Sequence, residues 1–203
     1  GKLIGTHGNI CTFSLQAIKH ITSVDGGLLF LPHQELNKRA RLLRWYGIDR
    51  DSPRKDFRCE ADIEEWGFKF HMNDVCAAIG IENFKHLETI VDTHQDNALY
   101  YDTHLKGVKG VTLLKREEGF DSAFWIYTML VDDRPSFYKY MENCGIMVSQ
   151  VHERNDKHSC MSEFKTELPN LENTIGNVVS IPVGWWVTPE DREYIVDAIK
   201  KWK

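Results

Sequence analysis

Lys19 lies on a short segment between two apolar runs, residues 10–14 and 27–31. Ser14 precedes this lysine, and Gly26-Gly27 follow it after a tight-turn signal. A lysine amine among apolar neighbours can act as a Schiff-base nucleophile, a serine hydroxyl can hold a phosphate, and glycines let backbone pass close to a bound group. A surface lysine with its ammonium in water fits the same spacing, so both interpretations stay open at this point.

The polar run around His152 and Arg154 is a second candidate site. Both side chains can contact sugar hydroxyls or a nucleotide phosphate, and a solvated loop explains the run equally well. His152, His158 and Cys160 are metal-ligand types, but their spacing matches no familiar zinc pattern, so no metal is predicted. Trp185-Trp186 fits a sugar-stacking pair, although we favour packing of the last helix against a sheet.

The elements that position Lys19 are short. Residues 10–14 and 27–31 are bounded by Gly, Asp and Pro and are predicted to be buried strands. Pro32 opens a helix with an apolar face, and Gly47 ends it.

A long helix is expected to follow. Asn73 or Asp74 caps it, and a 3.6-residue apolar rhythm runs to about Leu105 with a break near Gly80. Such a helix can join two domains.

The pattern changes after residue 107. We expect strands within 124–131, 146–151 and 178–181, and a short helix capped by Ser136. Thr188 followed by proline begins the last helix. This half is predicted to be an α+β domain with a small antiparallel sheet covered by helices.

Composition excludes several classes of protein. The net charge is -5 and no basic stripe is present, which argues against a nucleic-acid partner. No apolar run approaches the roughly 20 residues that cross a bilayer, so no membrane association is predicted. The five cysteines are odd in number and scattered, which is typical of reduced thiols in the cytoplasm.

Several ordered blocks carry a family resemblance. FSLQAIKHITSVDGGLLF is similar to the segment Ser-Phe-x-x-x-Lys-x-x-x-x-x-Glu-Gly-Gly of the DegT/StrS sugar aminotransferases, which are fold type I enzymes that use pyridoxal 5'-phosphate. LLRWYGI resembles the family's Leu-Arg-x-x-Gly helix end, and WGFKFHMNDVCAAIGIENF resembles its Gly-Tyr-Asn-Tyr-Arg-Met segment. SAFWIYTMLVDDR, CGIMVSQVHERNDKHS and VSIPVGWWVTPEDREYIVDAI follow its small domain, so the match covers essentially the whole chain.

The resemblance implies roles for single residues. Lys19 matches the Schiff-base lysine, which also carries the proton during transamination, and Ser14 matches the hydroxyl that binds the cofactor phosphate. The segment from Gly67 to Asn73 matches one that reaches the partner's cofactor in a homodimer with shared sites, which makes His71 a cofactor-binding candidate. Lys69-Phe70-His71 replaces the common Asn-Tyr-Arg, and Asp25 replaces Glu.

The resemblance also implies a fold and a function. Residues 1–95 are expected to be the remnant of the large α/β cofactor-binding domain with its linking helix, and 96–203 the small α+β domain. The function expected is transfer of an amino group, with glutamate as donor, to a keto group of a nucleotide-linked deoxysugar. In the family, the phosphate loop, the stacking aromatic and the aspartate beside the pyridine nitrogen precede the lysine strand. The alternative is therefore a truncated fragment that folds and dimerises without activity.

Overall fold

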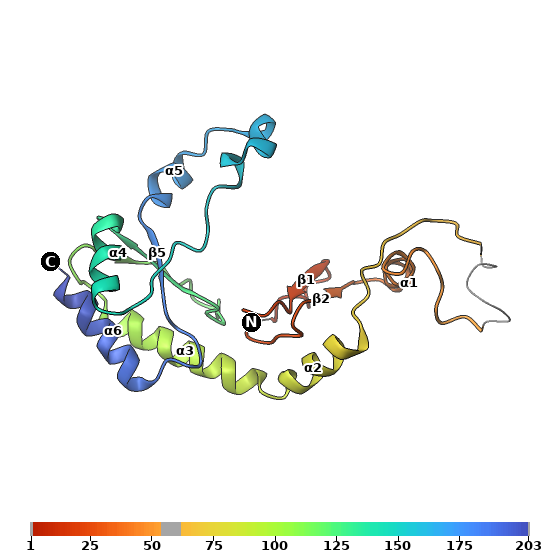
Figure 1. Ribbon diagram of the computed structural model, residues 1–203, viewed down its shortest axis with the longest axis horizontal. Coiled ribbons are helices and arrows are strands. Elements are labelled where there is room, and N and C mark those ends of the chain that lie inside the picture. The colour runs from red at the N-terminus through yellow and green to blue at the C-terminus, as the bar shows by residue number, and fades with distance from the viewer. Residues whose placement is uncertain (1, 54–61, 203) are drawn as a thin grey trace. The chain divides into compact units, whose positions relative to one another are not determined.

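The computed structural model describes residues 2–53 and 62–202, and Cys59 lies outside them. The chain divides into two compact units, Gly1–Leu87 and Glu88–Lys203. The division falls where helix α2, Asp74–Phe84, ends and helix α3, Leu87–His104, begins (Figure 1). The break in the predicted long helix therefore lies at residues 85–86 and not near Gly80, which is inside α2.

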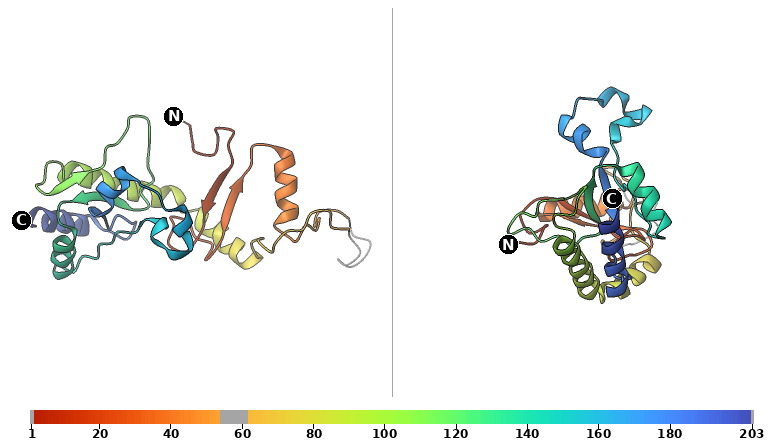
Figure 2. Two further views of the ribbon diagram at one scale, coloured as in Figure 1. Left: turned by 90° about the horizontal axis from the view of Figure 1, so that it is seen from above. Right: turned by 90° about the vertical axis from the view of Figure 1, so that its left-hand side faces the viewer.

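The first unit is built on a hairpin. Strands β1, Cys11–Ser14, and β2, Gly27–Phe30, pair antiparallel with Cys11 opposite Phe30, and helix α1, Gln34–Leu43, follows (Figure 2). Both strands were predicted, but the prediction that they are buried is wrong, since β2 is exposed along its whole length. Asn73 is the N-cap of α2, because its side chain accepts the backbone N–H of Cys76.

This first unit has almost no interior. Among its described residues, only Cys11, Ser23 and Trp45 are buried. Large apolar side chains are exposed on the hairpin: Ile10, Phe13, Leu28, Leu29 and Phe30. Exposed apolar surface of this kind is typical of interaction sites.

The second unit contains a three-stranded antiparallel sheet of order β3-β4-β5. The strands are β3, Val111–Leu113, β4, Tyr127–Val131, and β5, Val178–Ile181. The predicted α+β domain with an antiparallel sheet is thus confirmed. Two details are wrong: β3 was missed, and residues 146–151 form no strand but one isolated bridge between Ser149 and Ser180.

Helices cover this sheet. Helix α4, Arg134–Asn143, is capped by Asp133, which accepts the N–H of the predicted cap Ser136, and helix α6, Pro189–Lys201, begins with a capping box at Thr188 as predicted. Helix α5, Pro169–Ile175, and two 3-10 turns, Asn155–Lys157 and Ser159–Phe164, project from the unit in Figure 1.

A single core joins sheet and helices. Tyr101, Tyr127, Phe137 and Ile199 are fully buried in one cluster, and the Phe137 and Trp202 rings meet edge to face at 5.0 Å. Each such side chain contributes about 1.5–3 kcal/mol by leaving water. The second unit therefore has the interior that the first unit lacks.

Buried Asn97 ties α3 to the loop before α6. Its side-chain amide donates to the carbonyls of Val183, Gly184 and Val187 at 3.2–3.3 Å, and its oxygen accepts from Arg192. Three loop carbonyls that face away from water thus share one donor group.

We expect Asn97→Leu to lower the free energy of unfolding by about 2–3 kcal/mol, because it leaves these buried carbonyls without a donor. Urea unfolding followed by circular dichroism measures the change. Asn170→Leu, at an exposed position of α5, is the control and should change stability by less than about 0.5 kcal/mol. Equal effects of the two substitutions would contradict the role of Asn97.

The exposed hairpin predicts self-association. Leu29→Lys places a charge on its apolar face and should shift the protein toward single chains at matched concentration. Light scattering measures the mass, and Leu99→Lys, at an exposed site on α3, is the control. A wild-type protein that stays monomeric at high concentration would refute this expectation.

Candidate functional site

The loop between β1 and β2 carries Lys19. Its ends are closed by backbone bonds: the N–H of Leu15 donates to Gly26, and the N–H of Ser23 donates to Leu15, both at 2.9 Å. The Ser23 hydroxyl donates to the carbonyl of Asp25 at 3.0 Å. Because Ser23 is fully buried, these bonds are shielded from water and fix the shape of the loop.

Lys19 and Ser14 belong to one tight turn within this loop. The Ser14 hydroxyl accepts the N–H of Gln16 at 3.3 Å, and the N–H of Lys19 donates to the Gln16 carbonyl at 3.0 Å. Lys19 is half-buried and Ser14 is exposed. The Ser14 oxygen is an acceptor in this turn, so its own proton can be donated to an incoming anion. The turn therefore combines an amine nucleophile and a hydroxyl donor.

Helix α2 contacts the lysine loop, although the two lie far apart in the sequence. The Asn83 side chain donates to the carbonyl of Thr22 at 3.0 Å. Gly80 faces Ser23, and a Cβ at position 80 would lie 3.1 Å from the Ser23 Cβ. Sequence reasoning missed Asn83 and gave Gly80 the wrong role, because nothing local in the sequence links positions 22 and 83.

The Gly26-Gly27 pair serves packing inside the chain. Gly26 has φ +151°, and a Cβ there would overlap the Met72 side chain and lie 2.7 Å from the Ser23 hydroxyl oxygen. A Cβ at Gly27 would lie 2.9 Å from the Phe13 carbonyl. The two glycines thus allow other segments of the same chain to pack closely against the backbone at positions 26 and 27.

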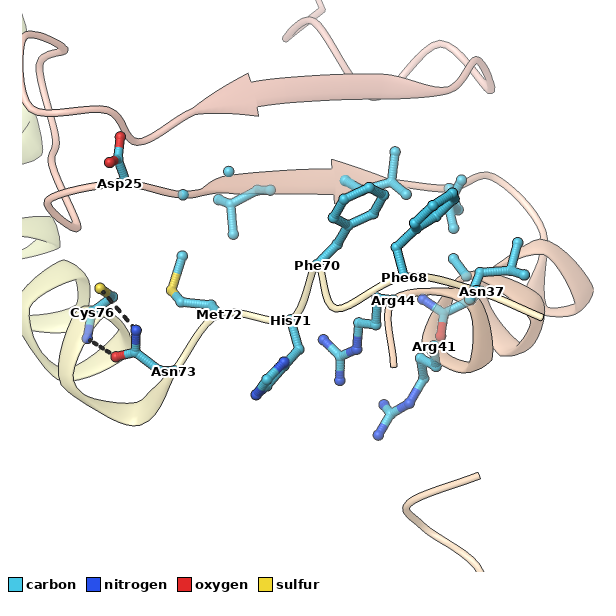
Figure 3. A pocket seen from close by; sticks show the side chains of 18 of the residues that line it. Asp25, Asn37, Arg41, Arg44, Phe68, Phe70, His71, Met72, Asn73 and Cys76 are labelled. Carbon is cyan, nitrogen blue, oxygen red and sulfur yellow. Dashed lines mark hydrogen bonds between the residues drawn. The ribbon is translucent and has the colours of Figure 1, made fainter. Parts of the chain in front are cut away.

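A cavity of about 1050 Å³ lies beside β2. It is bounded by β2, by α1 and by the segment 65–73, and its lining includes Phe68, Phe70, His71 and Met72 (Figure 3). Ser14 and Lys19 do not line it. The segment that the sequence analysis expects to cross a dimer therefore forms one wall of this cavity.

His71 contacts the buried indole of Trp45, with ring centroids 4.0 Å apart at 83°. Partial burial lowers the pKa of His71, and the positive charges of Arg50, Lys69 and Arg44 lower it further. The ring is therefore neutral near pH 7 unless an anion joins it.

His152 and Arg154 lie in the second unit. Arg154 forms ion pairs with Asp156, at 2.6 Å, and with Glu172, at 2.9 Å, and donates to the carbonyl of Thr166. Its guanidinium thus holds the projecting segment together. His152 is exposed, and its ring lies 6.2 Å from Trp125.

Trp185 and Trp186 are 59% and 62% exposed, so the favoured interpretation that they pack the last helix is wrong. Trp186 instead lies against Gly184, where any side chain would overlap its ring.

Within 2–53 and 62–202, no three His, Cys, Asp or Glu side chains are grouped so that they could hold a metal ion. No helix there is long and apolar enough to span a bilayer.

Comparison with known proteins identifies this arrangement. Residues 1–200 match the model of the DegT/DnrJ/EryC1/StrS aminotransferase family. The crystal structure of AtS13 from Actinomadura melliaura superposes with a TM-score of 0.94 at 48% identity, covering 98% of this chain and 53% of that one. The sugar aminotransferase CalS13 from Micromonospora echinospora gives a TM-score of 0.94 at 42% identity, covering 98% and 54%.

A curated relative has a more specific name. The UDP-4-amino-4-deoxy-L-arabinose–oxoglutarate aminotransferase of Shewanella sediminis is 26% identical over 99% of this chain and 56% of its own length. The chain thus spans about half the length of the proteins it matches. The fold predicted by resemblance is confirmed, and the chain belongs to the DegT/DnrJ/EryC1/StrS aminotransferase family, which uses pyridoxal 5'-phosphate.

Proposed function

We propose that this chain carries the cofactor-binding lysine of an enzyme that moves an amino group to a nucleotide-linked deoxysugar. The observation that carries the proposal is the tight turn that includes both residues: the Ser14 hydroxyl accepts the N–H of Gln16, and the N–H of Lys19 donates to the Gln16 carbonyl. The donor we propose is glutamate, and the acceptor is a keto carbon of the sugar. The names of relatives, such as an oxoglutarate aminotransferase acting on a UDP sugar, support this choice.

Lys19 is the residue we assign to covalent capture and proton movement. When bound, pyridoxal phosphate supplies an electron sink for charge that develops on the substrate carbon. Lys19 Nζ would hold the cofactor through its amine, and the same amine would move a proton to or from the substrate carbon. The backbone bond from Lys19 to Gln16 orients the start of this side chain.

Ser14 is the residue we assign to the cofactor phosphate. Its exposed hydroxyl already accepts from Gln16 and so has a proton to donate, which is the donor chemistry that a phosphate oxygen requires. The residues of the turn therefore fit the group that the family uses.

We further propose a homodimer in the reducing cytoplasm, with His71 near the partner's cofactor phosphate. The exposed apolar hairpin supports association, and Cys11, Cys76, Cys144 and Cys160 are all free thiols. We propose that His152 contacts the sugar substrate. Arg154 positions the loop that carries His152, because its guanidinium is bound to Asp156 and Glu172.

We expect Lys19 to be the lysine that pyridoxal phosphate modifies. The protein is treated with the cofactor, reduced with borohydride and digested, and the modified peptide is mapped by mass spectrometry. Lys19→Ala should abolish the label, whereas Lys38→Ala, at an exposed lysine on α1, should leave it unchanged. A label on another lysine, or equal labelling of Lys19→Ala, would reject the assignment.

Ser14→Ala should weaken retention of pyridoxal phosphate by about tenfold, because one hydrogen bond to a charged group is lost. Absorbance titration gives the affinity. Pyridoxal without its phosphate is the matched ligand and should bind wild type and variant equally. If Ser14→Ala weakened both ligands to the same extent, the hydroxyl would have another role.

A further inference from the structure

The aromatic rings of Trp125 and His152 meet in the second unit, although the two residues lie far apart in the sequence. Their centroids are 6.2 Å apart, and the ring planes are inclined by 61°. Strand β5 pairs along one edge with β4, which follows Trp125, and along the other edge Ser180 of β5 bridges to Ser149, which precedes His152. The two rings therefore come from opposite edges of one strand. Trp125 is half-buried and His152 is exposed, so both retain surface that a ligand can contact.

Each ring directly follows a residue whose backbone is in the left-handed region. Phe124, before Trp125, has φ +48°, and Val151, before His152, has φ +56°. Neither residue is glycine, and a β-branched valine rarely adopts this conformation. Such residues cost free energy, persist only where the surrounding structure imposes them, and gather at ligand-binding sites. The strained backbone thus sets the direction of both rings.

Helix α3 holds the segment that carries Trp125. The buried His94 donates through Nδ1 to the carbonyl of Phe124 at 2.8 Å, and the Gln95 side chain donates to the carbonyl of Ser122 at 3.0 Å. The guanidinium carbon of Arg116 lies 4.8 Å from the centroid of the Phe124 ring. These contacts impose the unusual backbone before Trp125.

A tight turn holds His152. Its N–H donates to the carbonyl of Gln150 at 2.6 Å, which closes a three-residue turn around Val151. Two residues later, the Arg154 guanidinium is fixed by both carboxylate oxygens of Asp156. Both rings are therefore held before a ligand arrives, which removes the cost of ordering them on binding.

The charges beside this ring pair are matched within the chain. Arg154 pairs with Asp156 and Glu172, and Lys157 pairs with Glu153 at 3.1 Å. A phosphate would have to compete with these carboxylates, whereas an uncharged flat ring would not. A ring placed between the two side chains would need about 7–8 Å for two contacts of about 3.5–4 Å each, so a ligand ring stacks on one side only.

We propose that Trp125 and His152 bind the base of the nucleotide, with the base stacked on the Trp125 indole and its edge toward the His152 ring. This inference rests on the proposed function, in which the substrate is a nucleotide-linked sugar, and it assigns the contact of His152 to one part of that substrate. A base has the flat π face that stacks on an indole, and its carbonyls and N–H groups can bond to an imidazole.

The test is isothermal titration of the full chain with UDP. Trp125→Ala should weaken binding by about 10- to 100-fold, because one base–indole stack is lost. Trp125→Phe keeps an aromatic face and should stay within about threefold of wild type. Trp185→Ala, which removes an indole that is 59% exposed, is the matched control and should bind like wild type.

His152→Ala tests the second ring at an exposed position and should weaken UDP binding by about tenfold. Circular dichroism and thermal unfolding show that each variant is folded. If Trp125→Ala fails to fold, Trp125→Leu takes its place, since leucine fills apolar space without a π face, and the same loss of affinity is expected.

Two partial ligands separate the base from the rest of the substrate. Uridine carries the base without phosphate, and glucose 1-phosphate carries a sugar and a phosphate without the base. Trp125→Ala should weaken uridine and UDP by the same factor and leave glucose 1-phosphate unchanged. Loss of glucose 1-phosphate binding with uridine unaffected would assign the indole to the sugar and overturn the proposal.

Absence of UDP binding by wild type, or wild-type affinity in both Trp125→Ala and His152→Ala, also overturns it. These outcomes are separate from that of the proposed function. Lys19→Ala should keep its UDP affinity, so failed labelling of Lys19 would leave the base site standing. Labelling of Lys19 together with unchanged UDP binding by Trp125→Ala would reject the base site alone.

Discussion

The shape of the lysine loop depends on Ser23, which is fully buried. This one residue closes the loop through its N–H and its hydroxyl, and its Cβ rests against Gly80 of α2. The loop has few other buried contacts, so its shape comes from hydrogen bonds shielded beneath the turn. The amine at the end of a long side chain is oriented toward a reacting group only when the backbone that carries it has a fixed conformation.

The two units obtain their stability in different ways. In the second unit, helices and sheet share one dense core, and Asn97 satisfies the carbonyls of the loop that closes it. The first unit has a hairpin, two helices and only three buried residues among those described. The first unit thus carries the proposed site on a framework with exposed apolar surface, and association with another chain is one way to bury that surface.

Local signals in the sequence predicted local structure well. Asn73 and the Thr188-Pro189 start of α6 were found because capping is decided by residues within one turn. The burial of β2 was predicted wrongly because the sequence Gly27–Phe30 shows that the strand is apolar, but it does not show whether other residues pack against the strand.

Features that depend on distant residues escaped prediction. Asn83 bonds to Thr22 across 61 positions. The contacts of Trp45 with Lys69 and His71 likewise depend on the folded backbone, which brings residues from two parts of the sequence together. The match to the family identified the lysine and the serine, but it said nothing of which side chains surround Trp45.

The contact between Gly26 and Met72 has an evolutionary consequence. Any side chain at position 26 would overlap Met72, and Met72 immediately follows His71 in the segment that borders the cavity. A residue other than glycine at position 26 therefore requires that the Met72 side chain move and that the backbone keep a φ of +151°, which favours glycine. The lysine loop and the segment that borders the cavity are thus packed together at this one position, so the residue types accepted at positions 26 and 72 depend on each other.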